Sequence, residues 1–186
     1  AAADAVTLWS DNAAKAATAA CLHMSGNGLV EARMYAMVHA AVHDAVNALD
    51  RRSRPYAFDE ASPLASPDAA VAAAARDVLV AVIPGLPEST DCVTNGVAQA
   101  NASYAAALAS IPDGPAKTLG IALGQAAAAA IVTLRANDGS NQEMFDFDYV
   151  QGTEPGEWRF TPDFPLPLAF GPKWGEVTPF VLQRSS

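Results

Sequence analysis

The side chains best suited to chemistry recur at every fourth position of one segment: Tyr35, His39, His43 and Asn47. Residues four apart lie one above another on a helix, so this spacing places the four side chains along one edge. Two imidazoles at i and i+4 match the spacing of a metal-binding pair, for which Glu31 or Asp44 would be the third ligand. The glutamate of the zinc motif H-E-x-x-H is absent, because Ala40 stands in its place.

Two ligands do not fix a metal, so we assign no metal ligand and keep His39, His43 and Asp44 only as weak candidates. Buried polar groups need hydrogen-bond partners, and we expect structural roles instead. Each histidine is expected to be buried and to bond a backbone carbonyl, Tyr35 or Asn47. Asp44 is expected to accept from Arg33 or from a loop amide. We assign no catalytic residue and no cofactor to this chain.

The helix that carries these groups is predicted over residues 29–50, where apolar residues recur at three-and-four spacing. A polar row beside that apolar stripe indicates a helix buried nearly all round, and we expect the rest of the chain to be organised around it. Three arginines follow it: Arg51, Arg52 and Arg54. They could hold a phosphate, but we favour a solvated helix end, because basic residues complement a helix C-terminus.

Four further helices are predicted, bounded by cap residues, prolines and glycines: 4–23, 68–83, 88–110 and 117–135. In the last of them Gly120, Gly124 and Ala128 repeat at four, which lets a neighbouring backbone approach closely. We see no strand pattern of any length before residue 140. Residues 1–140 are therefore expected to form an all-α bundle of about five helices.

The composition changes after Ser140, because nine of the 14 aromatic residues and six of the 13 prolines lie in residues 141–186. This segment has no helical period, so we predict an extended strap. Aromatic rings are costly to leave in water, and eight of these are expected to rest on a surface. They are Phe145, Phe147, Trp158, Phe160, Phe164, Phe170, Trp174 and Phe180. Part of that surface is expected to be the bundle, and the remainder to lie outside these 186 residues.

Charge and composition exclude some partners. A net charge of -9 and a pI near 4.6 oppose binding to nucleic acid or to an anionic membrane. Polar residues interrupt the alanine tracts, so no membrane span is expected. The first residues, AAADAV, resemble the remainder of a cleaved signal peptide and predict a secreted or periplasmic protein. Cys21 and Cys92 have structural roles, either joined across about 70 residues or as two buried thiols.

Several blocks of the sequence resemble one enzyme superfamily. They are MVHAAVHDAVNAL, PDAAVAAAARDVLVAVIPG, IPDGPAKTLGIALGQAAAAAIVTLRANDGS, GTEPGEWRFTP and WGEVTPF. In order and approximate spacing they resemble the helical N-terminal half of bacterial secreted vanadium-dependent haloperoxidases and type 2 phosphatidic-acid phosphatases, the acid phosphatase superfamily. The resemblance implies that the strap leads into a C-terminal catalytic half of the same precursor, where vanadate or phosphate would be held.

The anion-binding motifs of that superfamily do not occur in this chain. They are Lys-x6-Arg-Pro, Pro-Ser-Gly-His and Ser-Arg-x5-His-x3-Asp, whereas the one Arg-Pro here, Arg54-Pro55, has Asn47 at the lysine position. We therefore expect a non-catalytic scaffold and cover for an enzyme that acts on phosphate esters or, with vanadate, oxidises halide with peroxide. The alternative is a stand-alone helical binding module whose aromatic strap engages a protein or an apolar ligand.

Overall fold

The computed structural model describes residues 4–25, 27–162 and 168–182, and the chain forms two compact units, Ala1–Ala136 and Asn137–Ser186. The first unit is helical and the second is mostly irregular. The sequence placed the boundary at residue 140, whereas the structure places it slightly earlier. Asp138 belongs to the second unit, where its backbone carbonyl accepts a hydrogen bond from the Thr178 amide.

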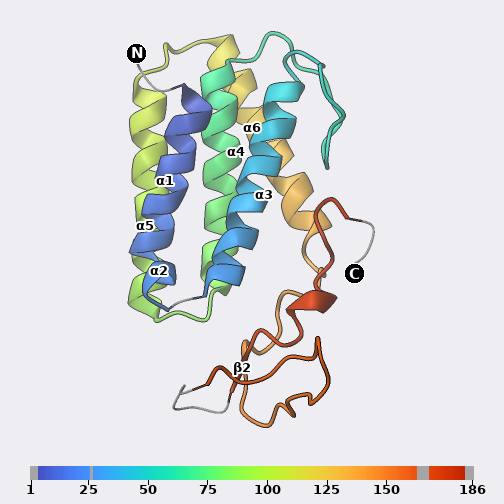
Figure 1. Ribbon diagram of the computed structural model, residues 1–186. Helices are drawn as coiled ribbons and strands as arrows, with labels where there is room; N and C mark the ends of the chain where they lie inside the picture. Colours follow the sequence, from blue (N-terminus) through green and yellow to red (C-terminus); the bar gives the residue numbers. More distant parts are fainter. Residues whose placement is uncertain (1–3, 26, 163–167, 183–186) are drawn as a thin grey trace. The chain divides into compact units, whose positions relative to one another are not determined.

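The described part of the first unit contains one short and five long α-helices (Figure 1). They are α1 (Ala5–Ala19), α2 (Leu22–Ser25), α3 (Gly28–Asn47), α4 (Pro67–Val82), α5 (Thr90–Ala109) and α6 (Pro115–Leu134), and the 3-10 turn η1 (Ile83–Gly85) follows α4. The predicted all-α character is confirmed. The helix predicted over 4–23 is interrupted, because Cys21 takes a positive φ of 62° and turns the chain into α2.

Local side chains set where the helices begin. Asp4, Ser66 and Ser89 each accept a hydrogen bond from a backbone amide in the first turn of α1, α4 and α5 respectively. Such caps satisfy amides that have no partner within the helix. Pro67 and Pro115 occupy the first position of their helices, where no amide donor is needed.

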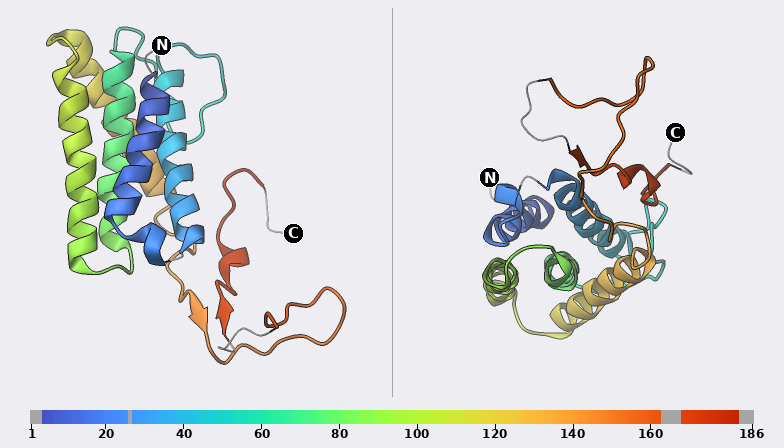
Figure 2. Two further views of the ribbon diagram at one scale, coloured as in Figure 1. Left: turned by 60° about the vertical axis from the view of Figure 1, so that its left-hand side comes forward. Right: turned by 90° about the horizontal axis from the view of Figure 1, so that it is seen from below.

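Helix α4 lies at the centre of the bundle, with α1, α3, α5 and α6 around it (Figure 2). Seven consecutive residues of α4, 69–75, are buried, and all of them except Val71 are alanine. A helical stretch without polar side chains, such as 69–75, can be buried on every side. The expectation that α3 holds this central position is wrong, since α3 keeps an exposed edge.

The glycines of α5 and α6 lie where helices touch through their backbones. A Cβ on Gly120 would lie 2.5 Å from the carbonyl oxygen of Ser66, and one on Gly124 would lie 2.7 Å from the Ala73 Cβ. A Cβ on Gly96 would lie 2.6 Å from the Ala20 Cβ. The predicted close approach to the α6 glycines is therefore confirmed. Close backbone packing compensates for the small area that each alanine buries.

By the two criteria of length and composition, helix α6 could cross a membrane. Lys117 is the one charged residue in 115–134, and the absence of a membrane span stays a prediction that this helix does not test. The core helix of a globular protein passes the same test. One face of α6, which includes Leu123 and Ile131, is buried in the bundle, where α6 packs on α3 and α4.

A disulfide bond joins Cys21, between α1 and α2, to Cys92 in the first turn of α5. The sequence left this pairing open. The bond closes a segment with a sequence separation of 71, and its Cα atoms are 5.5 Å apart. In the chain-entropy account, closing a loop of this size stabilises a fold by about 4 kcal/mol. It reinforces the same α1–α5 contact that Gly96 makes against Ala20.

The second unit has little regular structure in its described residues, 137–162 and 168–182. Strands β1 (Phe145–Asp146) and β2 (Ala169–Phe170) pair antiparallel, with Phe145 opposite Phe170, and η2 (Trp174–Glu176) is a 3-10 turn. The Phe145 and Phe170 rings lie 5.4 Å apart. Trp158 meets two other rings edge-on, those of Tyr149 and Phe160, each at 5.1 Å.

Several of the eight rings expected to rest on a surface are exposed. Phe147 is 64% exposed and Trp158 is 44% exposed, and Phe145 and Phe170 are exposed as well. Phe164 lies outside the described residues. Aromatic pairing within the second unit therefore covers only part of the area that these rings offer.

Replacing Gly124 by alanine tests the contact between α4 and α6. The new methyl group would meet the Ala70 carbonyl oxygen and lie 2.7 Å from both the Ala73 Cβ and the Ala74 amide nitrogen. Overpacking outweighs the gain in helix propensity, so we expect a net loss of about 2 kcal/mol in the free energy of unfolding. Urea unfolding followed by circular dichroism measures it.

The matched control is Gly28→Ala in the first turn of α3, where an added Cβ has nothing within 4 Å. We expect this variant to stay within about 0.5 kcal/mol of the parent. Equal stabilities for the two variants would contradict the close packing of α6 on α4.

Candidate functional site

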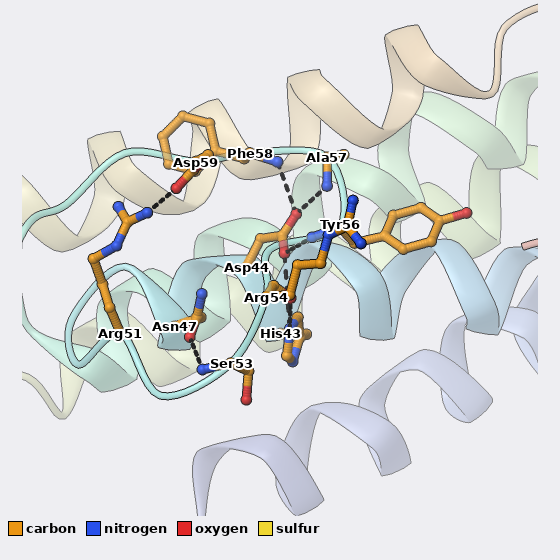
Figure 3. A network of polar contacts seen from close by, with 10 residues as sticks. All are labelled: His43, Asp44, Asn47, Arg51, Ser53, Arg54, Tyr56, Ala57, Phe58 and Asp59. Atoms are coloured by element: carbon orange, nitrogen blue, oxygen red, sulfur yellow. Dashed lines mark hydrogen bonds and ion pairs between the residues drawn. The ribbon is translucent and has the colours of Figure 1, made fainter. Parts of the chain in front are cut away.

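Asp44 is the polar centre of the first unit. Its side chain is on α3, and the residue is 1% exposed. One carboxylate oxygen accepts from the Tyr56 amide at 2.7 Å, and the other accepts from the amides of Ala57 at 2.7 Å and Phe58 at 2.9 Å (Figure 3). The expectation that Asp44 accepts from a loop amide is confirmed. Three charge-assisted hydrogen bonds offset the cost of burying the carboxylate.

Asn47 holds the part of the same loop that lies nearer to the end of α3 in the sequence. It is 7% exposed, and its Oδ1 accepts a hydrogen bond of 2.9 Å from the Ser53 amide (Figure 3). Asp44 and Asn47 are three residues apart and therefore lie on neighbouring positions of one helix face. Together they hold residues 53–58 against α3.

Two of the three arginines that follow α3 contact carboxylates. Arg51 pairs with Asp59, and Arg52 Nη2 lies 2.6 Å from Asp50 Oδ2. The carbonyl oxygen of Arg54 accepts from His43 Nε2 at 3.2 Å, an arrangement that requires the proton on that ring nitrogen. Figure 3 shows Arg51 with Asp59, and Arg54 with His43, along the loop. The arrangement agrees with a solvated end of the helix region more than with a phosphate site.

The two histidines are exposed, so the expectation that they are buried is wrong. His43 bonds a backbone carbonyl, as expected, but on the surface of the loop. Tyr35 bonds neither histidine, because its hydroxyl donates to Glu31 Oε1, one turn away, at 2.5 Å. Burial, together with that hydrogen bond, raises the pKa of Tyr35.

The weak metal candidates do not form a ligand set. The Asp44 oxygens accept from three amides, and His43 Nε2 lies 4.0 Å from Asp44 Oδ1 while it donates to Arg54. Among the described residues there is no group of three His, Cys, Asp or Glu side chains placed to hold a metal ion.

A pocket of about 600 Å³ opens beside these groups. It lies between the start of α1, the outward edge of α3 and the loop that follows α3. Its lining residues are Val6, His39, Val42, His43, Val46, Asn47, Asp50, Arg52 and Ser53. The volume is in the range of small-molecule sites. The structure therefore brings the sequence-selected His39, His43 and Asn47 to one pocket, whereas Asp44 holds the loop behind it.

Sequence reasoning missed a second polar cluster, between α4 and α5. Arg76 Nε lies 2.8 Å from Asp77 Oδ1, and the Arg76 guanidinium stacks 4.2 Å from the centre of the Tyr104 ring. Partial burial raises the pKa of Asp77, and the neighbouring Arg76 lowers it by less. The signal in the sequence was an adjacent Arg and Asp inside an otherwise apolar helix. Such a pair is costly to bury without partners.

Comparison with known proteins gives no relative from which to transfer a function. No family model matches the chain, and neither the curated proteins nor the solved structures contain a significant match.

Replacing Asp44 by asparagine tests its role in holding the loop. The amide removes the charge and turns one acceptor into a donor that faces a backbone amide, so we expect a loss of about 3 kcal/mol in the free energy of unfolding. Amide hydrogen exchange at residues 56–58 should accelerate strongly. The control is Asp59→Asn, which removes an exposed pair with Arg51 and should cost less than about 1 kcal/mol. Unchanged exchange at residues 56–58 in Asp44→Asn would refute the role.

Carboxyl NMR titration tests the environment of Asp77. We expect its midpoint above the ordinary 3.8, because burial raises its pKa. Its contribution to stability is then fully present below pH 3.8 and is lost as pH rises through the raised pKa. Asp113 is the internal control, since its side-chain hydrogen bond to Lys117 lowers its pKa. Its contribution is present above 3.8 and lost as pH falls through the lowered value. Midpoints in the reverse order would contradict both environments.

Proposed function

We propose that this chain is a non-catalytic scaffold and cover, the helical N-terminal half of an enzyme similar to vanadium haloperoxidases and acid phosphatases. The complete enzyme would act on phosphate esters or oxidise halide with peroxide. Vanadate or phosphate would be held by its C-terminal half, which would be the partner of this chain. The sequence blocks quoted above support the family proposal.

The observation that carries the scaffold proposal is the exposed aromatic surface of the second unit. Phe147 is largely exposed, and Trp158 stays 44% exposed although neighbouring rings pair with it from two sides. Clustered exposed rings mark interaction surfaces, because leaving them in water is costly. We propose that the strap, residues 141–186, presents these rings to the catalytic half.

Hydrogen bonds within the strap hold the ring cluster in one arrangement. Glu157 accepts from the amides of Thr153 and Glu154, and the Gly152 amide donates to the Trp158 carbonyl. Gln151 accepts from the Phe160 amide. A turn that is closed in this way orders Trp158 before a partner arrives, which lowers the entropy cost of binding.

The polar groups of the first unit support a structural role. The Asp44 carboxylate is taken up by three amides, and Arg51 and Arg52 contact acidic side chains. Catalytic acids and bases need access to a substrate, which a fully engaged buried carboxylate does not have. We therefore propose that the chemistry of the complete enzyme takes place elsewhere.

We propose a secreted or periplasmic location. The Cys21–Cys92 disulfide supports it, because such bonds persist in oxidising compartments and are rare in the cytosol. The net charge of -9 supports partners other than nucleic acid.

The alternative proposal is a stand-alone binding module. The ring cluster of Tyr149, Trp158 and Phe160 favours it, because this cluster could receive an apolar ligand or a protein without any catalytic half. The two proposals differ in the partner that the rings contact.

The scaffold proposal predicts that the isolated chain is inactive and that it binds a defined partner tightly. The purified chain should hydrolyse p-nitrophenyl phosphate and oxidise bromide with vanadate and peroxide only at buffer rates. The coding DNA that follows residue 186 should encode a Pro-Ser-Gly-His motif. That segment, expressed separately, should bind this chain one to one by calorimetry, and Trp158→Ala should weaken binding by about ten-fold or more.

The control is Leu64→Ala, since Leu64 is exposed but lies in the loop before α4. It should leave binding unchanged. Turnover by the chain alone, or a following segment without the motif, would overturn the scaffold proposal. Binding of an unrelated protein through Trp158, with no catalytic half encoded, would favour the alternative.

A further inference from the structure

The pocket beside α3 contains a buried polar group that the fold leaves with unused donors. Asn47 is 7% exposed, and its Oδ1 is fixed by the Ser53 amide, so its Nδ2 group is the part left to face the pocket. No partner for Nδ2 is found among the described residues. Nδ2 is not one of the fully buried side-chain atoms without a partner, so it keeps contact with solvent, and an acceptor atom of a ligand would replace water there.

A second donor lies at the rim of the same pocket. The Arg52 guanidinium lines it and pairs with Asp50 at 2.6 Å, but both side chains are largely exposed. Exposed ion pairs contribute little to stability, so Arg52 can exchange Asp50 for another carboxylate at small cost. Arginine binds carboxylates through two parallel N–H groups, which makes it the natural group to hold such a ligand.

Three valines form the apolar part of the pocket lining. Val6 comes from α1 and Val42 and Val46 from α3, and Val42 is 4% exposed. These side chains offer a surface to a hydrocarbon body and no partner to a second charged group. The imidazole of His39 adds a polar group to the lining of the same pocket.

We propose that this pocket binds a small carboxylate with a short apolar body. The carboxylate accepts from Asn47 Nδ2 and from the Arg52 guanidinium, and the hydrocarbon part packs on Val42 and Val46. The two donors favour an anion once Arg52 has exchanged Asp50 for the ligand, and the valines select an amphipathic acid over a compact anion such as phosphate. This inference is independent of the scaffold proposal, because it uses first-unit residues alone.

Solution NMR of the complete 186-residue chain tests the site, with hexanoate as the probe. We expect saturable shifts of the Asn47 side-chain amide and of the Val42 and Val46 methyl groups. Hexan-1-ol has the same hydrocarbon body but no charge. It should bind more weakly than hexanoate by about five-fold or more. Inorganic phosphate should not displace hexanoate at equal concentration.

Two variants each remove one of the proposed hydrogen-bond donors while the loop stays folded. Asn47→Asp keeps the oxygen that the Ser53 amide needs and replaces the donor by a negative charge, so hexanoate affinity should fall by about ten-fold or more. Arg52→Gln should reduce it by about five-fold. The control is Arg51→Gln, because Arg51 pairs with Asp59 and does not line the pocket. An unchanged Ser53 amide resonance confirms that the loop stays folded.

The proposal would be overturned by any of three results. Equal affinity for hexanoate and hexan-1-ol would show an apolar site without carboxylate recognition. Displacement by equimolar phosphate would show a general anion site. Full affinity in Asn47→Asp with an unchanged Ser53 resonance, or shifts confined to residues outside the pocket, would place the binding elsewhere.

Discussion

Close contact between helix backbones is the constraint on which the first unit depends. Alanines supply much of this core, and seven consecutive buried residues of α4 include six of them. Such residues gain stability only where neighbouring helices approach until main chains touch, as α6 does at Gly120 and Gly124. The packing of α3 on α4 and α6 follows from this arrangement. It determines which edge of α3 is left to carry the loop and the pocket.

The loop after α3 takes its shape from one buried charge. The Asp44 carboxylate accepts hydrogen bonds from three consecutive amides, and Asn47 accepts a fourth nearer the helix end. Loops seldom pack closely on helices unless their backbone groups find partners. Here the helix supplies those partners. Four hydrogen bonds to side chains of α3 therefore hold the loop that forms one wall of the pocket.

The sequence allowed much of the bundle to be predicted, because helix limits depend on local residues. Cap residues such as Ser66 and prolines such as Pro67 marked the helix starts, and the Gly120–Gly124 repeat marked a close contact. The central position of α4 was not predicted. Periodicity shows which residues share a face, but it does not show how many faces are covered.

The candidate site was predicted only in part for the same reason. His43 and Asn47 are one turn apart on one edge, yet the first is exposed and the second is buried. The difference arises because the loop folds over Asn47 and leaves His43 at its margin, and no local pattern encodes that fold. Ring pairs such as Phe145 with Phe170 depend on segments 25 residues apart, which periodicity does not relate.

The disulfide between α1 and α5 bears on how the protein matures. These 186 residues contain two cysteines, so one intramolecular pairing exists among them. Oxidation of this chain therefore needs an electron acceptor but no reshuffling of wrongly joined thiols, in contrast to scaffolds with several cystines. The competing covalent product is a dimer between two chains, which low protein concentration disfavours.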